Sequence, residues 1–183
     1  QNLLELGAIL EKTHPDDAKA WSISGDLLYY SNRPTEALEK YRQCIRLSPR
    51  VFSVWDNTLT ILAEQKNFDE MLRFAEQAMD AFPNQPKAYF YYGIAANLKG
   101  QYDDAINQLE QAMLMVGSNT ALRLDLTDQI GLSLLGKKEF SAAITHYEQS
   151  LPKGGEQHPG ILEHYGDALS LNGQHDRAIE QWK

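Results

Sequence analysis

The chain has 183 residues, of which 43% are hydrophobic and 23% charged, a balance typical of a folded domain with a buried core. Its net charge of −8 disfavours binding to nucleic-acid phosphates, and no stretch approaches the roughly 18 apolar residues of a membrane-spanning helix. A single cysteine, Cys44, excludes an internal disulfide. The chain starts at Gln1 rather than Met, so we interpret it as a piece of a longer protein; cytoplasm and periplasm both stay open.

In chain order, a pattern of large and small apolar residues begins at Trp21 and recurs every 34 residues. The first copy consists of Trp21, Gly25, Leu28, Ala37, Tyr41, Cys44 and Pro49. The second consists of Trp55, Leu59, Leu62, Met71, Ala75, Ala78 and Pro83. The third consists of Tyr89, Gly93, Ala96, Ala105, Leu109, Ala112 and Gly117. Three copies in register indicate a repeat protein.

The register then shifts twice. The fourth copy, with Gly131 and Tyr147, comes four residues late, which predicts an insertion near 116–122. The fifth, with Gly166 and Trp182, comes one residue late, and a turn at 152–155 is expected to absorb that residue. We predict one array with these parts: a half-unit at 1–15, units at 18–51, 52–85, 86–119 and 124–157, and an incomplete unit at 159–183.

Each unit is expected to contain two helices of roughly 12–15 residues, because apolar residues recur at i, i+3, i+4 and i+7. A glycine inside a helix costs up to about 1 kcal/mol relative to alanine. Gly25 and its counterparts therefore predict a close approach by an aromatic side chain of the second helix. Thr58, Leu59 and Met71 replace the small residues of the second complete unit, which predicts wider packing there. Residues 2–12 are predicted to be the second helix of the leading half-unit.

The pattern W-x-x-S-G-x-x-L…A-x-x-x-Y…P at Trp21–Pro49 closely resembles the tetratricopeptide consensus, and the resemblance extends over essentially the whole chain. It implies an all-α, right-handed superhelical solenoid of helix–turn–helix repeats. It also implies a non-enzymatic scaffold that binds a protein or peptide in a concave groove lined by the first helix of each unit. Residue usage suggests a bacterial protein.

Carrying the groove position over unit by unit gives a set of acidic, aromatic and amide side chains. The predicted peptide-binding residues are Asp26, Tyr29, Asp56, Asn57, Thr60, Phe90, Tyr91, Asn97, Asp128 and His164. Their character favours a neutral-to-basic partner. Ser22 and Asp26 stand where some family members carry a lysine–asparagine clamp for a carboxyl terminus, so that mode is not expected. The alternative is that these residues only pack or face solvent; Tyr92, for instance, is expected to be buried.

Residues for catalysis, cofactor binding or metal binding are not predicted. No two of the five histidines have the spacing of three or four that places ligands on one helix face, and Gly154–Gly155 lacks the lysine of a phosphate loop. Cys44 lies at a core position and is expected to be inert. Two other functions stay open: a non-catalytic arm of a larger enzyme or of a secretion or assembly machine, and a homo-oligomer formed through the repeat ends.

Overall fold

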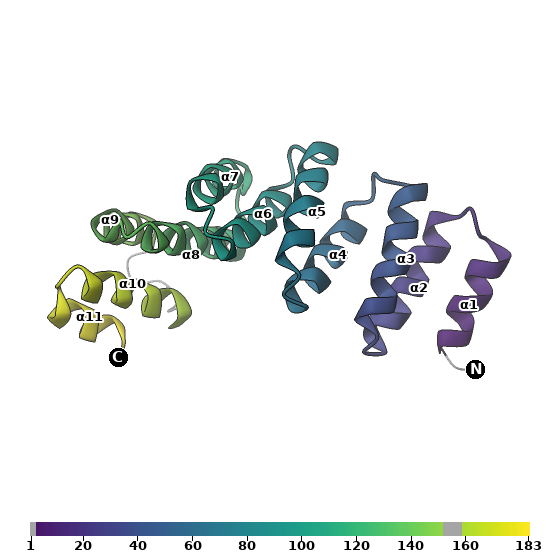
Figure 1. Cartoon of the computed structure of the whole chain (residues 1–183), viewed down its shortest axis with the longest axis horizontal. Coiled ribbons are helices and arrows are strands. Elements are labelled where there is room, and N and C mark those ends of the chain that lie inside the picture. Colours follow the sequence, from purple (N-terminus) through teal and green to yellow (C-terminus); the bar gives the residue numbers. More distant parts are fainter. Residues whose placement is uncertain (1–2, 152–158) are drawn as a thin grey trace. The chain divides into compact units, whose positions relative to one another are not determined.

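The computed structural model describes residues 3–151 and 159–183, which form eleven helices and no strand (Figure 1). The backbone divides into two compact units, one ending at Pro83 and the other beginning at Asn84. The prediction of an all-α fold of helical repeats is confirmed. None of the described helices has both the length and the apolar character needed to cross a membrane.

The first unit contains one leading helix and two helical hairpins. Its helices are α1 (Leu3–Thr13), α2 (Ala18–Tyr30), α3 (Pro34–Leu47), α4 (Phe52–Glu64) and α5 (Phe68–Ala81). Within each hairpin, α2 with α3 and α4 with α5, the two helices pack side by side, and α1 packs on α2. The predicted leading helix over residues 2–12 therefore corresponds to α1.

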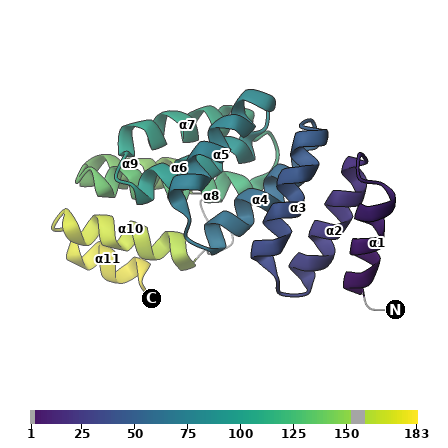
Figure 2. The ribbon, with the colours of Figure 1, turned by 45° about the vertical axis from the view of Figure 1, so that its right-hand side comes forward.

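The second unit contains three hairpins. Its helices are α6 (Pro86–Leu98), α7 (Tyr102–Met115), α8 (Thr120–Gly136), α9 (Phe140–Ser150), α10 (Pro159–Leu171) and α11 (His175–Gln181). The partners α8 and α9, and likewise α10 and α11, lie side by side in both views (Figures 1 and 2). The turn expected at 152–155 lies outside the described residues.

The turns inside the hairpins are short, and each reverses the chain at a residue with positive φ. Gly100 (φ 75°) and Gly173 (φ 80°) end α6 and α10, where glycine adopts this conformation without strain. Asn32, Lys66 and Lys138 take the same conformation in the other three hairpins. Pro34 is the first residue of α3, where its missing N–H costs nothing.

Close helix packing at the glycines of the repeat register holds four of the hairpins together. A Cβ atom on Gly25 would lie 2.5 Å from Tyr41 Cε1, and one on Gly131 would lie 2.1 Å from Tyr147 Cζ. Trp182 closes over Gly166 in the same way. The predicted contact between a glycine and an aromatic ring is therefore confirmed, while Leu109 fills the place of the ring over Gly93.

The hairpin of α4 and α5 lacks such a glycine. Thr58, Leu59 and Met71 are completely buried between its helices. The two backbones stay close over a shorter stretch than in the α2–α3 or α6–α7 hairpins, as expected from the larger side chains.

The predicted insertion near 116–122 lengthens a helix. Helix α8 has 17 residues, whereas α2, α4, α6 and α10 each have 13. By the repeat register the additional residues are Thr120–Arg123, which form the first turn of α8 behind the N-cap Asn119.

Candidate functional site

In the first unit, two of the predicted binding residues form an internal polar cluster. The half-buried Asp26 of α2 accepts hydrogen bonds from Tyr41 Oη (2.7 Å) and from Asn57 Nδ2 (3.3 Å). Burial, with the hydrogen bond to Asp26, raises the pKa of the Tyr41 hydroxyl well above its usual range, so that it remains a donor. The cluster joins α2, α3 and α4, so Asp26 and Asn57 serve first to position helices.

The aromatic pair at the end of α2 faces solvent. The Tyr29 hydroxyl donates to Glu64 Oε1 of α4 at 2.9 Å, and this hydrogen bond is the main cause of a raised Tyr29 pKa. The Tyr30 ring meets the Tyr29 ring edge-on at 5.8 Å between centroids, and Tyr30 is 85% exposed. Because Tyr29 is fixed to Glu64, it supports Tyr30 as an ordered, accessible aromatic surface.

Helix α4 carries a polar stripe beside this pair. Asp56, Thr60 and Glu64 follow one another at intervals of four residues, which places them on one helix face. Thr60 Oγ1 donates to the Asp56 backbone carbonyl at 2.9 Å, so its hydroxyl is used within the helix. The two carboxylates give the stripe its negative charge.

In the second unit, the predicted residues of α6 differ in exposure and bonding. Phe90 and Tyr91 are both partly exposed, with ring centroids 5.7 Å apart. Asn97 is tied to α8: its Nδ2 donates to the Gln129 carbonyl (3.0 Å), and its Oδ1 accepts from Ser133 Oγ (2.6 Å). Asn97 therefore joins two first helices and has little capacity left for a ligand.

The expectation that Tyr92 is buried is wrong, since this residue is only half-buried. Ala88, Ala95 and Ala96 occupy the fully buried positions of α6. A tyrosine side chain is amphipathic, so it can pack its apolar body against the protein while its hydroxyl end reaches solvent, which accounts for partial exposure.

A second polar cluster joins α8, α9 and α10. The Asp128 carboxylate accepts from His164 Nδ1 at 2.7 Å and from Tyr147 Oη at 3.4 Å. Burial raises the pKa of the Tyr147 hydroxyl, which keeps it protonated. His164 precedes Gly166 by two residues, as Asn57 precedes Leu59, so both clusters use the same repeat position.

Some of the predicted residues lie at exposed surfaces, and the others form hydrogen bonds between helices. Groups of three or more His, Cys, Asp or Glu side chains that could hold a metal ion do not occur within residues 3–151 and 159–183. Cys44 is buried as predicted, and burial raises the pKa of its thiol, which disfavours the reactive thiolate.

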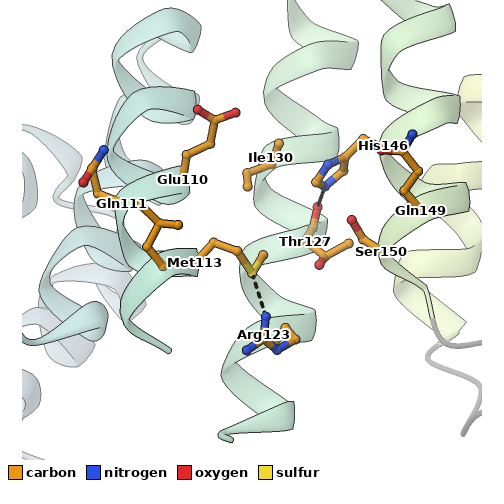
Figure 3. Close-up of a pocket in the computed structure, with 10 residues that line it drawn as sticks. Glu110, Gln111, Met113, Arg123, Thr127, Ile130, His146, Gln149 and Ser150 are labelled. Atoms are coloured by element: carbon orange, nitrogen blue, oxygen red, sulfur yellow. Dashed lines mark hydrogen bonds between the residues drawn. The ribbon is translucent and has the colours of Figure 1, made fainter. Parts of the chain in front are cut away.

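The sequence reasoning missed a pocket of about 610 Å³ between α7, α8 and α9 (Figure 3). Thr127 and Ile130 of α8 form its floor, with Met113 of α7 and His146 of α9 on opposite walls. His146 Nε2 donates to the Thr127 carbonyl (2.9 Å), and burial lowers the pKa of the ring. The only available signal was the four-residue insertion, which brings Arg123 to one end of the pocket.

Comparison with known families and structures gives one consistent result. The sequence model of the tetratricopeptide repeat family matches residues 4–52, 24–86 and 59–120, which together span well over half of the chain. Several solved structures share the fold. MamA from Desulfovibrio magneticus RS-1 (residues 41 to the end) is 17% identical, with a TM-score of 0.76 and 90% of each chain covered.

Two further structures illustrate the range of these relatives. YrrB, described as a tetratricopeptide protein with an unusual peptide-binding site, is 16% identical, with a TM-score of 0.72, and the match covers 97% of this chain and 89% of YrrB. PilF from Pseudomonas aeruginosa is 18% identical, with a TM-score of 0.71, covering 93% of this chain and 76% of PilF. At these identities the likeness establishes the fold alone.

Proposed function

Since the chain belongs to the tetratricopeptide repeat family, we propose that it is a protein-interaction scaffold whose first-helix faces bind a neutral-to-basic peptide segment of a partner protein. The fold is of the scaffold type. YrrB, which shares the fold, is a peptide-binding protein by its own description. The chemistry of the faces supports the proposal.

One observation carries this proposal: Tyr30 is 85% exposed on a helix end that is otherwise well ordered by hydrogen bonds. Covering a large exposed ring with a partner lowers the free energy of the complex, because apolar surface leaves water. An aromatic ring also loses little side-chain entropy on binding. Because Tyr29 supports the ring edge-on, Tyr30 is suited to anchor a peptide side chain or a proline.

The carboxylates next to this anchor give the face its preference for charge. Asp56 and Glu64 lie on the stripe of α4, and Glu64 accepts from Tyr29. A lysine or arginine of the peptide would meet a negative potential there, whereas an acidic peptide would be repelled. Phe90 and Tyr91 offer the corresponding aromatic surface in the second unit.

The polar clusters divide the predicted residues into those proposed to position helices and those proposed to contact the peptide. Asp26, Asn57, Asn97, Asp128 and His164 are engaged with other helices and are proposed to position the faces. The proposed peptide contacts are those of Tyr29, Tyr30, Asp56 and Thr60 in the first unit and, as a separate surface, those of Phe90 and Tyr91 in the second unit.

Selection from a random peptide library against the full chain tests this proposal. The selected peptides should be neutral or basic, and Tyr30→Ala and Phe90→Ala/Tyr91→Ala should each weaken their binding by about tenfold, as expected for aromatic anchors. Tyr30→Phe is the matched control, because it keeps the ring and should keep the affinity. Selection of acidic peptides, or unchanged affinity in both variants, would refute the proposal.

Self-association is a second candidate, favoured by a stripe on α1. Leu3, Leu6 and Ile9 recur every three residues and are 61%, 45% and 46% exposed. Multi-angle light scattering over a range of concentrations should show oligomers that Leu6→Lys/Ile9→Lys disrupts and Leu171→Lys on α10 does not. A monomer at every concentration would exclude this candidate.

A further inference from the structure

The pocket between α7 and α9 continues along α8 as an open groove. A second depression shares Glu110, Ile130, His146 and Gln149 with the first. Arg123, Thr127, Ile130 and Leu134 of α8 line this surface from end to end. Since a helix rises 1.5 Å per residue, this floor extends over about 16 Å, or roughly three helical turns.

The floor of the groove is apolar at Ile130 and Leu134 and polar at Thr127 and Arg123, and its rim is open. Ile130 is buried beneath it, while Leu114 on the α7 side is 81% exposed. Thr127 Oγ1 is buried without a hydrogen-bond partner among the described residues, so this polar atom lies beneath the floor and is not accessible to a partner. An exposed leucine at the edge of an apolar groove is typical of a surface that a partner covers.

The rim of the groove carries one basic and one acidic side chain, Arg123 and Glu110. Arg123 is engaged by its own chain: its Nη2 donates to the Gly117 carbonyl at 2.6 Å, and its Nη1 lies 3.6 Å from Met113 Sδ. Glu110 on the opposite wall is exposed and forms no ion pair with any residue of 3–151 or 159–183. The lowered pKa of His146 keeps its ring neutral near pH 7. Arg123 is exposed and keeps its positive charge at one end of the groove, so the place where a basic group of a partner would be favoured is beside Glu110.

We propose that this groove is a second docking site, separate from the first-helix faces, and that it binds an amphipathic helix of a partner protein carrying a lysine or arginine at the edge of its apolar stripe. Apolar side chains at i, i+4 and i+7 of such a helix would lie over Leu114, Ile130 and Leu134. The basic residue would pair with Glu110. This is the helix-in-groove mode of recognition.

Two synthetic peptides provide the probe. Both are stapled helices of about four turns with leucine at i, i+4 and i+7; one has lysine and its twin has glutamate beside the stripe. The chain contains four methionines, so methyl-labelled methionine gives few NMR signals. The lysine peptide should shift the Met113 methyl signal and leave that of Met71, which is buried in the first unit, unchanged. It should bind at least about fivefold more tightly than its twin, the effect of one partly exposed charge pair.

Matched variants separate the groove from the general charge of the protein. Ala142 lines the groove and is exposed, so Ala142→Arg should block it and weaken binding by at least about tenfold. Ala121→Arg adds the same charge at an exposed position of α8 that does not line the groove, and should leave binding unchanged. Glu110→Gln should remove the preference for the lysine peptide. Circular dichroism melting confirms that each variant is folded.

The proposal is overturned by no shift of Met113 with either peptide, by equal binding of the two peptides, or by equal effects of Ala142→Arg and Ala121→Arg. A Met113 shift that depends on protein concentration alone would identify a second copy as the occupant and would also overturn it. Tyr30→Ala should not affect this binding. Failure here is thus distinguishable from failure of the first-helix proposal.

Discussion

Asp128 and His164 lie 36 positions apart in the sequence, yet the Oδ1 atom of one and the Nδ1 atom of the other are 2.7 Å apart. This hydrogen bond links the first helices of two successive repeats, as the bond from Asn57 to Asp26 does in the other unit. The aspartates occupy different repeat positions, three before Gly131 in one case and directly after Gly25 in the other. The accepting aspartates therefore occupy different positions of the repeat, whereas the donors Asn57 and His164 occupy the same position.

Removing the donor should destabilise the second unit. His164→Ala is expected to lower the free energy of unfolding by about 1 kcal/mol, since Asp128 would lose one of its two hydrogen-bond donors in a half-buried site. His164→Asn should retain much of the stability, because asparagine serves at the same position in Asn57. Urea unfolding followed by tryptophan fluorescence, with the exposed His175→Ala as control, measures the difference. Equal midpoints for His164→Ala and His175→Ala would contradict the role assigned to the cluster.

Two glycine substitutions test the close packing of the hairpins. Gly131→Ala would place a Cβ atom 2.1 Å from the Tyr147 ring, whereas nothing lies within 4 Å of a Cβ atom at Gly160. We expect Gly131→Ala to destabilise the protein by about 1–3 kcal/mol through overpacking. Gly160→Ala should be neutral or stabilising by up to about 1 kcal/mol, the usual gain of alanine in a helix. Thermal melts of both variants decide this, and a similar loss in both would show that helix propensity, not packing, dominates.

Two buried threonines should respond differently to loss of the hydroxyl. Thr127 Oγ1 has no hydrogen-bond partner among the described residues, whereas Thr58 Oγ1 donates to the Val54 carbonyl at 2.7 Å. Thr127→Val removes an unsatisfied polar atom and should stabilise the fold by about 1 kcal/mol. Thr58→Val gives up a satisfied hydrogen bond and should gain less or lose stability. Chemical denaturation compares the two, and a larger gain for Thr58→Val would be inconsistent with the assignment.

Acid should weaken the second unit through His146. Burial lowers the pKa of His146 below its ordinary 6.5, so the folded state favours the neutral ring and the unfolded state binds the proton more readily. The contribution of the neutral His146 ring to the free energy of unfolding is complete above pH 6.5 and is lost as the pH falls through the folded-state pKa. Urea unfolding at a series of pH values should show this loss, and His146→Gln should reduce it. NMR titration of the imidazole must place its pKa below 6.5; a value above would refute the sign of the effect.

Much of the helical layout was predictable from the residues. The glycines and the second-helix aromatics indicated where helices pair, and the late fourth copy indicated the insertion that lengthens α8. These features follow from local periodicity, because a side chain three, four or seven positions away shares a helix face whatever the rest of the chain does.

The hydrogen bonds that the candidate-site residues form with other helices were not predictable from local periodicity. The face on which Asn97 lies follows from its place in the repeat, but its bonds to Gln129 and Ser133 depend on how α6 meets α8. Tyr92 shows the same limit, since its partial exposure depends on how α6 packs in the folded chain.

The 34-residue spacing of small and large residues was enough to establish the family, the paired helices and the glycine contacts, because those depend on helix periodicity and side-chain size. Only the folded structure decided that Asp128 bonds to His164 and that a groove opens between α7 and α9. It also decided that Tyr30 is exposed next to Tyr29, whose hydroxyl donates to Glu64. Those relationships join residues from different helices, and their distances are set by how the helices pack against one another, which no local pattern encodes.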